Sequence, residues 1–234
     1  MRYRAVLFDA GETILHPSPS FPGLFAAVLE GFGHDVDEYT IHDGLLAIPQ
    51  RFIHAAEQGE LWTTSPERSR AFWTSVYDLF LERVGLPIGD GLQDALYTAF
   101  TDVRNYALFN DVQPAFDALT GGGLHLGLVS NFEAWLDELL IHLGIREAFD
   151  VRVISGVEGI EKPDPAIFEL ALQRGGLQPE EAVYVGDVPE FDVAPPLAMG
   201  VHAVLIDRRE RHPAFDGARV TDLRDLPALL GVGE

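Results

Sequence analysis

Four short stretches carry the residues that could do chemistry, and two of them place carboxylates after apolar runs. Asp9 follows the run AVLF within the stretch LFDAGETIL, and Asp187 and Asp192 follow the run AVYVG. A carboxylate at the end of a buried strand can act as a nucleophile or bind a metal ion. A lone aspartate at such a place could instead close a turn or cap a helix. The functional hypothesis therefore depends on all four stretches together.

The other two stretches supply possible partners for an anion. Ser130 and Asn131 close the run LHLGLVSN, where a hydroxyl and an amide could cradle an anion or cap a helix. Lys162 lies in GIEKPDP, just before two prolines that stiffen the backbone. It is the only lysine among 16 lysine and arginine residues, which argues against an ordinary solvated surface position. An ammonium held in this way can neutralise a phosphate oxygen or the charge on Asp9.

A magnesium site is the expected use of the three carboxylates. Asp9, Asp187 and Asp192 would repel one another if the fold gathered them without a cation. Mg²⁺ prefers oxygen ligands and keeps several waters, so two carboxylates and a backbone carbonyl suffice. Calcium fits less well, because the sequence has no EF-hand loop spacing.

Five apolar runs predict the strands that must position these residues: 4–9, 124–130, 151–155, 182–186 and 203–207. Helical periodicity appears between the later runs, at 133–143 and 165–174. Alternating strands and helices predict an α/β fold with a doubly wound, Rossmann-like parallel sheet of five or more strands. Ligands bind outside the carboxyl ends of the strands in such sheets.

An insert separates the first two predicted strands by more than a hundred residues, whereas a crossover needs only about 12. Helical spacing over 21–31, 41–57, 66–84 and 91–103 predicts that this insert is all-helical. Ser65 and Pro66 suit an N-cap and a first helical turn. We expect a core of residues 1–16 and 111–234 and a helical cap domain of residues 17–110, with hinges at 16–20 and 109–111.

The composition limits the class of protein. A net charge of -21 argues against nucleic-acid and acidic-membrane partners. The absence of cysteine excludes disulfides, thiol catalysis and cysteine-based zinc sites. No apolar run approaches the roughly 18 residues of a membrane span, and the first residues lack the apolar region of a signal peptide. These features favour a cytoplasmic protein.

Together the four stretches resemble the motifs of the haloacid dehalogenase (HAD) superfamily of hydrolases. Its pattern is an aspartate nucleophile after the first strand, a serine or threonine, a lysine, and an acidic Gly-Asp-Asp pair. The matching positions are Asp9, Ser130 with Asn131, Lys162, and Asp187 with Asp192. The match spans residues 4 to about 206, and the insert is similar to that of the subgroup with haloacid dehalogenases and phosphoglycolate-type phosphatases. This resemblance implies a mobile helical cap.

The resemblance also implies a reaction. In similar phosphatases, the aspartate attacks phosphorus and forms an aspartyl-phosphate that water then hydrolyses. Carried over, Asp9 is the nucleophile, and Mg²⁺ bridges its carboxylate and the phosphate. The remaining metal ligands would be Asp187, Asp192, directly or through a water, and the backbone carbonyl of Gly11.

The same resemblance assigns the phosphate-binding groups. Ser130, Asn131 and Lys162 would hold the transferring group, where positioned donors matter most. Backbone N–H groups from Ala10 and Gly11 onward would complete the cradle. The substrate would be a small phosphorylated metabolite, and the protein a monomer or homodimer.

One position departs from the phosphatase pattern, which has a second aspartate two residues after the nucleophile. That residue is the general acid and base, typically worth 10²–10⁴-fold, and Gly11 stands in its place. We hypothesise a swap, in which Gly11 forms the turn and Glu12 supplies the proton. The alternative is a Glu12 that points into solvent.

Two other functions remain open. A metal-independent 2-haloacid dehalogenase also lacks the second aspartate, but the acidic pair at Asp187 and Asp192 favours a metal-dependent phosphohydrolase. A catalytically weak member that binds a ligand without turning it over is the second alternative. Phosphonate cleavage through a cap lysine is excluded, because the insert contains no lysine.

Substrate choice in similar enzymes comes from residues of the cap. The candidates here are arginines and tryptophans of the insert: Arg51, Arg68, Arg70 and Arg104, with Trp62 and Trp73 as apolar walls. Trp73 lies on an apolar helical stripe, which favours a place in the interior of the cap.

Overall fold

A six-stranded parallel sheet is the framework of the computed structural model, which describes residues 2–232. The strand order is β5-β4-β1-β6-β7-β8, so β1 lies between two series of strands that run outward from it. The strands are β1 (Ala5–Phe8), β4 (His125–Ser130), β5 (Val151–Ile154), β6 (Ala182–Gly186), β7 (His202–Ile206) and β8 (Arg219–Val220). The predicted α/β, doubly wound class is confirmed.

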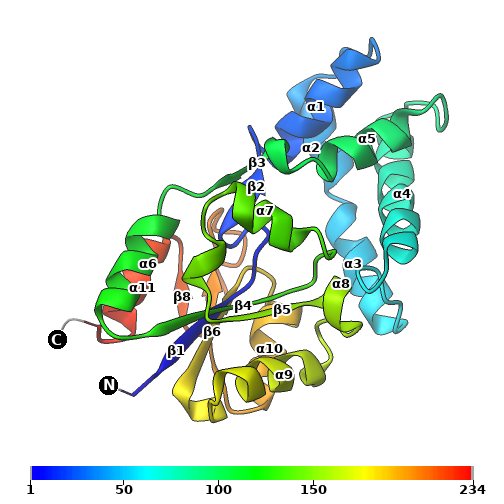
Figure 1. Ribbon diagram of the computed structural model, residues 1–234. Helices are drawn as coiled ribbons and strands as arrows, with labels where there is room; N and C mark the ends of the chain where they lie inside the picture. Colours follow the sequence, from blue (N-terminus) through cyan, green and yellow to red (C-terminus); the bar gives the residue numbers. More distant parts are fainter. Residues whose placement is uncertain (1, 233–234) are drawn as a thin grey trace. The chain divides into compact units, whose positions relative to one another are not determined.

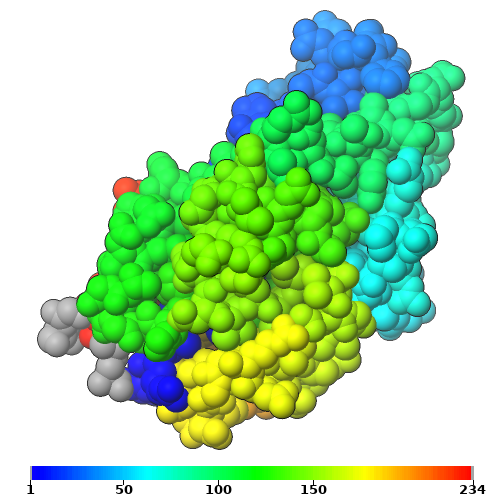
Figure 2. All heavy atoms as spheres, viewed as in Figure 1, coloured from blue at the N-terminus to red at the C-terminus, as the bar shows by residue number. Residues whose placement is uncertain are grey.

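Helices cover both faces of this sheet (Figure 1). The helices around it are α6 (Val112–Gly121), α7 (Leu136–His142), α8 (Ser155–Glu158), α9 (Pro165–Gly175), α10 (Ala194–Ala198) and α11 (Leu226–Leu229), with short turns at Arg146–Ala148, Pro179–Glu181, Pro189–Val193 and Leu223–Asp225. Helices α6 and α11 pack on one face, and α9 and α10 on the other. On the side shown in Figure 2, residues from α6 to α9 (green to yellow) form much of the visible surface.

The interior explains why the strands read as apolar runs. All four residues of β1 are at most 3% exposed, because helices bury the sheet on both faces. On one face, Leu7, Phe168 and Tyr184 belong to a continuous apolar cluster between the sheet and α9. On the other, the ring of Phe116 lies against Phe8 (5.2 Å between centroids) and Phe149 (5.5 Å).

The strand register places three of the four chemistry-bearing stretches at one edge of the sheet. Phe8, the last residue of β1, lies opposite Leu128 of β4 and Val185 of β6. The segments that follow these three parallel strands therefore emerge together, next to the point where the strand order reverses. This is where open α/β sheets bind ligands.

The chain divides into two compact units. The sheet unit contains the residues before position 16 and after position 107, and the helical unit contains residues 16–107. The helices of this helical unit are α1 (Phe21–Gly31), α2 (Glu38–Leu45), α3 (Ile48–Glu57), α4 (Pro66–Arg83) and α5 (Leu92–Phe100), followed by a short turn at Val103–Asn105. The boundaries at 15/16 and 107/108 compare with the expected 16/17 and 110/111. No helix in the described part of the chain is both long and apolar enough to cross a membrane.

One predicted helix of the helical unit was wrong. The segment 41–57 forms two helices, because α2 ends at Leu45 and α3 begins at Ile48. Pro49 lies in the first turn of α3, where its missing N–H costs nothing, but it could not continue α2. The N-cap at Ser65 is confirmed: its hydroxyl accepts a hydrogen bond from the N–H of Arg68 at 3.3 Å.

Aromatic rings fill the interior of the helical unit. Phe25 is fully buried and its ring contacts Phe80 (4.4 Å between centroids), Phe100 (4.9 Å) and Phe21 (5.4 Å). Such rings bury large apolar areas and add favourable tilted contacts. This unit is therefore held by apolar packing across α1, α4 and α5.

Two short paired strands link the units along the chain. They are β2 (Leu15–Pro17) and β3 (Tyr106–Leu108), which form a two-stranded sheet. The N–H of Phe109 donates to the carbonyl of Ile14 at 3.2 Å, and that of Ser18 to Asn105 at 2.8 Å. The chain therefore leaves the sheet unit and returns to it along adjacent strands.

Candidate active site

Asp9 begins a tight loop at the end of β1. Its N–H donates to the carbonyl of Val185 at 2.9 Å, which continues the β1–β6 pairing by one residue. The carbonyl of Ala10 then accepts the N–H groups of Ile14 (2.9 Å) and Leu15 (3.1 Å). Arg208, after β7, donates to the carbonyl of Thr13 at 2.7 Å. These contacts fix the loop that presents the Asp9 carboxylate.

Glu12, and not Gly11, forms the turn in this loop. Glu12 has a φ of 52°, in the left-handed region, whereas Gly11 does not adopt a left-handed φ. The hypothesis that Gly11 takes over the turn was therefore wrong. The Glu12 carboxylate accepts a hydrogen bond from Arg209 at 2.7 Å through Oε2, and this ion pair helps to hold an unusual backbone conformation.

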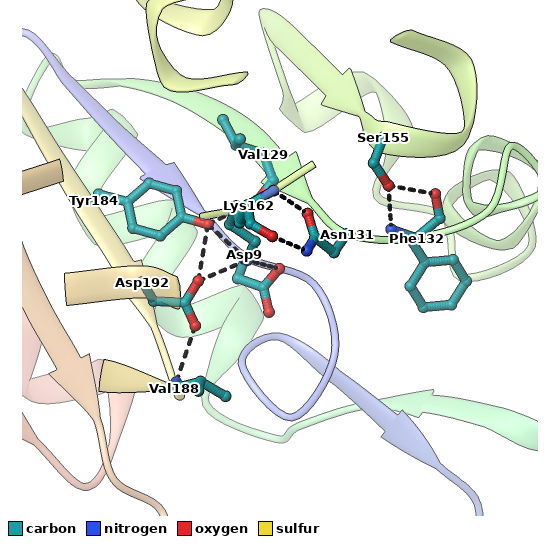
Figure 3. Close-up of polar contacts among 9 residues, drawn as sticks. All are labelled: Asp9, Val129, Asn131, Phe132, Ser155, Lys162, Tyr184, Val188 and Asp192. Atoms are coloured by element: carbon teal, nitrogen blue, oxygen red, sulfur yellow. Dashed lines mark hydrogen bonds and ion pairs between the residues drawn. The ribbon is translucent and has the colours of Figure 1, made fainter. Parts of the chain in front are cut away.

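Lys162 is the centre of the buried polar cluster (Figure 3). Its Nζ donates to Asp192 Oδ1 at 2.6 Å, to Asp9 Oδ1 at 2.8 Å and to the hydroxyl of Tyr184 at 3.1 Å. An ammonium has three N–H donors, and all three have acceptors here. The side chains of Lys162, Asp9 and Asp192 are 3%, 10% and 1% exposed, so this is a buried ion-pair network.

The cluster keeps Lys162 charged. Burial lowers the pKa of Lys162, but the neighbouring carboxylates of Asp192 and Asp9 more than offset this and raise it above its ordinary value. Burial, reinforced by the same two carboxylates, raises the pKa of the Tyr184 hydroxyl well above its ordinary value. The site thus holds a permanent ammonium beside a neutral phenol.

Asn131 binds the backbone of Lys162 at both ends of its amide. Its Oδ1 accepts the N–H of Lys162 at 2.6 Å, and its Nδ2 donates to the carbonyl of Lys162 at 2.8 Å. Ser130, the buried last residue of β4, precedes it, and Ser155 fixes the next residue, Phe132, through both its N–H and its carbonyl. Asn131 therefore positions the Lys162 loop, and its predicted contact with phosphate stays a prediction.

Asp192 is presented by one turn of π-helix, Pro189–Val193. Its Oδ2 accepts the N–H of Val188 at 2.9 Å, while its Oδ1 receives Lys162. A Cβ added at Gly186 would lie 2.3 Å from the Asp192 carboxyl carbon, so only glycine allows this approach. π-helical turns often occur at functional sites.

Asp9, Asp187 and Asp192 can together hold a metal ion. Each offers a carboxylate oxygen, and these atoms lie within 4.8 Å of one another. Burial, with the charges of Asp192 and Asp9, raises the pKa of Asp187 well above its ordinary value. Three carboxylates against one ammonium leave two uncompensated negative charges, which a divalent cation would balance. The donor set of hard oxygens fits Mg²⁺.

The loop after Asp9 also offers backbone donors. The N–H groups of Ala10 and Gly11 make no hydrogen bond to another residue in the described part of the chain. Successive free N–H groups of this kind can bind an anion. Both belong to the loop that presents Asp9.

Tyr184 and Arg209 are two site residues that the sequence reasoning missed. Tyr184 had a signal, because it places a hydroxyl inside the otherwise aliphatic buried strand AVYVG. Arg209 had none: its pairing with Glu12 joins residues 197 positions apart.

The candidate residues of the helical unit have mostly found partners within it. Carboxylates pair with three of the four arginines: Arg51 with Glu60, Arg70 with Asp94, and Arg104 with Asp102. Trp73, which was expected in the interior of the cap, packs against Phe72 and Tyr77. Trp62 is 3% exposed and stacks on Phe72, whereas Trp73 is only half-buried.

The fold and the site define a class before any comparison. A parallel sheet that gathers an aspartate, a buried lysine and two further carboxylates at one edge defines an α/β protein with an acidic site able to hold a metal ion. Comparison with known proteins is specific: residues 3–200 match the model of the family described as haloacid dehalogenase-like hydrolase. The chain belongs to this family of hydrolases.

Phosphatases are among its relatives. The chain is 39% identical over 189 residues to a phosphoserine phosphatase from Thermus thermophilus, a match covering 79% of this chain and 74% of that protein. It is 32% identical over 234 residues to a glyceraldehyde 3-phosphate phosphatase from Methanopyrus kandleri, covering 95% and 91%. These relatives support phosphohydrolase activity.

Solved structures share the fold. The HAD-hydrolase YfnB from Bacillus subtilis bound to magnesium superposes with a TM-score of 0.78 at 17% identity, covering 99% of this chain and 100% of that one. The L-2-haloacid dehalogenase from Xanthobacter autotrophicus superposes with a TM-score of 0.70 at 19% identity, with the same coverage. At these identities the likeness concerns the fold alone.

Proposed function

We propose that this protein is a Mg²⁺-dependent phosphohydrolase that acts on a small phosphorylated metabolite through an aspartyl-phosphate on Asp9. The observation that carries the proposal is the convergence of Asp9, Lys162, Asp187 and Asp192 at one edge of the sheet. The phosphatase relatives support the same reaction class.

Asp9 is the nucleophile in this proposal. Its Oδ1 accepts from Lys162, while its Oδ2 has no hydrogen bond to another described residue and is free to attack (Figure 3). Attack by an Asp9 carboxylate oxygen forms an O–P bond and breaks the bond to the leaving-group oxygen, which takes a proton from Glu12 and departs as the alcohol. Water then hydrolyses the aspartyl-phosphate and restores the carboxylate.

Lys162 and the loop donors hold the developing charge. Lys162 is fixed beside the nucleophile, and the free N–H groups of Ala10 and Gly11 belong to the same loop. Preorganised donors of this kind lower the barrier more than donors that must first reorganise. Ser130, at the end of β4, is the proposed hydroxyl ligand of the phosphate.

Asp9, Asp187, Asp192 and the carbonyl of Gly11 would hold the Mg²⁺ ion. When bound, the ion supplies positive charge to the phosphoryl group and offsets the mutual repulsion of the carboxylates. Asp187 is the more open of the two later acids, because both oxygens of Asp192 already accept hydrogen bonds.

Glu12 is the proposed base for the water that releases phosphate. Its Oε1 is buried and has no hydrogen-bond partner among the described residues, while Oε2 is held by Arg209. The charge of Glu12 acts on Asp187, which indicates that the two carboxylates are near each other. Glu12 reaches the site from a different backbone position than the usual second aspartate, and we expect a slow enzyme.

A panel of phosphorylated metabolites and 2-haloacids, each assayed with Mg²⁺ and with EDTA, tests the proposal. Phosphate release that EDTA abolishes and Mg²⁺ restores is the expected result. Halide release that survives EDTA would instead identify a 2-haloacid dehalogenase, which the missing second aspartate at Gly11 would suit. Calorimetric titration with Mg²⁺ is the second measurement, and absence of binding would refute the metal site.

A further inference from the structure

Tyr184 is the one member of the buried cluster that belongs to none of the four stretches. It lies in the middle of β6, opposite Leu7 in the register, and is fully buried. A phenylalanine would fill the same space in the apolar cluster. Burying a hydroxyl is costly unless it is hydrogen-bonded, so its contacts indicate what the group does there.

The hydroxyl of Tyr184 joins two of the chemistry-bearing segments. It donates its single proton to the carbonyl of Val129 at 2.8 Å, immediately before Ser130. Its oxygen accepts an N–H of Lys162 at 3.1 Å. Figure 3 shows the phenol directed at both partners from the strand that leads to Asp187.

The direction of each bond follows from the donor inventory. Tyr184 has one proton, and the 2.8 Å contact to Val129 is shorter than the 3.3 Å contact to Asp192. Tyr184 and Asp192 are therefore both acceptors of the same ammonium. Asp9 takes the third N–H, so the hydroxyl is the only neutral member of the acceptor set.

Packing fixes the ring independently of the hydroxyl. The ring of Phe168, on α9, meets Tyr184 edge-on at 5.0 Å between centroids and 84° between planes. Helix α9 begins at Pro165, three residues after Lys162. The same helix thus holds the phenol and the end of the loop that carries the ammonium, which gives the 3.1 Å contact a rigid support.

We propose that Tyr184 is a positioning residue for the reaction, whose hydroxyl aims the Lys162 ammonium at Asp9 and ties it to the end of β4. The inference rests on the proposed function, because it assigns Lys162 a part in phosphoryl transfer. Without the hydroxyl, one ammonium N–H and the carbonyl of Val129 each lose a partner. The ammonium can then turn between Asp9 and Asp192.

The sole lysine makes a direct measurement possible. In protein labelled with ¹⁵N at lysine Nζ, the side-chain ammonium spectrum contains the signal of Lys162 alone. In the wild type we expect one sharp signal with slow proton exchange, because all three protons are bonded and buried. Rapid exchange, as at an exposed lysine, would overturn the inference without any variant.

Tyr184→Phe is the test variant, since it keeps the ring and the contact with Phe168. We expect ammonium proton exchange about tenfold faster, corresponding to one lost hydrogen bond. In the assay with p-nitrophenyl phosphate and Mg²⁺ we expect kcat about tenfold lower with KM within about twofold, because a misaimed donor weakens the transition state more than substrate binding.

Tyr3→Phe is the matched control. It removes a tyrosine hydroxyl from the same unit but at the opposite end of β1, where the ring stacks on His202. It should leave ammonium exchange and kcat unchanged. Thermal unfolding of both variants shows what fraction of protein is folded in each assay.

Two results would overturn the inference: unchanged exchange in Tyr184→Phe, or faster exchange with kcat unchanged. Failure of the proposed function looks different. If the wild type releases no phosphate from any ester, the phosphohydrolase is refuted, while the exchange measurement still decides whether Tyr184 holds Lys162.

Discussion

The sheet unit and the helical unit differ in where their charged side chains lie. Among the described residues, every buried charged side chain lies in the sheet unit: Asp9, Asp111, Glu161, Lys162, Asp192 and Asp207. In the helical unit, pairs such as Arg70 with Asp94 lie at the surface, and aromatic rings fill the interior. Buried ion pairs are weak sources of stability, because desolvation offsets their attraction. Three of the six, Asp9, Lys162 and Asp192, form the candidate active site, whereas Asp207 binds the backbone of its own loop. The sheet unit therefore buries charges for chemistry and for loop structure, and the described part of the helical unit buries none.

Asp9→Asn should produce the largest effect. It tests whether the buried carboxylate of Asp9 is the nucleophile. The amide cannot attack phosphorus, so we expect kcat to fall by at least about 10⁴-fold. The measurement is steady-state hydrolysis of p-nitrophenyl phosphate with Mg²⁺. Asp207→Asn is the matched control, because Asp207 is also a buried strand-end aspartate but binds the N–H groups of Arg211 and His212. An equal loss of kcat in both variants would contradict the assignment of Asp9.

Phe25→Ala tests how much the aromatic interior contributes to the stability of the helical unit. Removing a fully buried ring should lower the free energy of unfolding by about 3–5 kcal/mol, through lost apolar burial and the remaining cavity. Phe25→Leu, which better preserves volume, should cost less than about 1.5 kcal/mol. Urea unfolding provides the values. The Lys162 ammonium signal should keep its position in both variants at low urea, and a shift would show that the units are not independent.

Gly11→Asp should raise activity. It tests whether the missing second aspartate limits the rate at the candidate active site. It restores an acid and base two residues after Asp9, and we expect kcat to rise about 100-fold. The added side chain has room, because a Cβ at Gly11 meets no atom within 4 Å and the residue does not adopt a left-handed φ. Gly11→Asn has nearly the same shape without the proton chemistry and serves as the control. A gain in both variants would mean that shape, and not proton transfer, limits the rate.

Asp222→Asn should have the smallest effect. It tests whether an exposed ion pair of the sheet unit contributes little to the free energy of unfolding. The guanidinium of Arg224, bound at 2.8 Å, lowers the pKa of Asp222 to about 2 from its ordinary 3.8. Because the folded-state pKa is depressed, the stabilisation is present above about pH 4 and is lost as the pH falls toward 2. Arg224 is more than half exposed, so we expect a loss of about 0.5 kcal/mol or less at neutral pH.

Urea unfolding of wild type and Asp222→Asn at pH 7 and pH 3 measures this contribution. The difference between the two proteins should be larger at pH 7 than at pH 3. A loss of several kcal/mol at pH 7 would contradict the view that only buried charges have large effects.

The sequence predicted the sheet because each strand carries its own signal. Apolar runs such as AVYVG, with turn residues after them, indicate a buried parallel strand and also where it ends. Strand β8 escaped prediction because it has only two residues, Arg219 and Val220. The site followed from the sheet: residues after neighbouring parallel strands must emerge together, and Lys162 was found because it is the only lysine.

Features that depend on contacts between distant segments could not be predicted. The turn at Glu12 is sustained by Arg209, which follows β7, and nothing near Glu12 in the sequence indicates that partner. Trp62 and Trp73 both contact Phe72, and the sequence does not indicate that Trp62 is the more deeply buried of the two. The break in the segment 41–57 was readable, since Pro49 disfavours a continuous helix.

The pairing of β2 with β3 has a consequence for how such a chain can change. Since the two strands lie side by side, a tight turn could join them and close the sheet unit without the ninety or so residues between. Closing a loop costs free energy that grows only slowly with its length. Inserts of very different size could accordingly be joined to β2 and β3 without any change to the residues at the strand ends of the sheet unit.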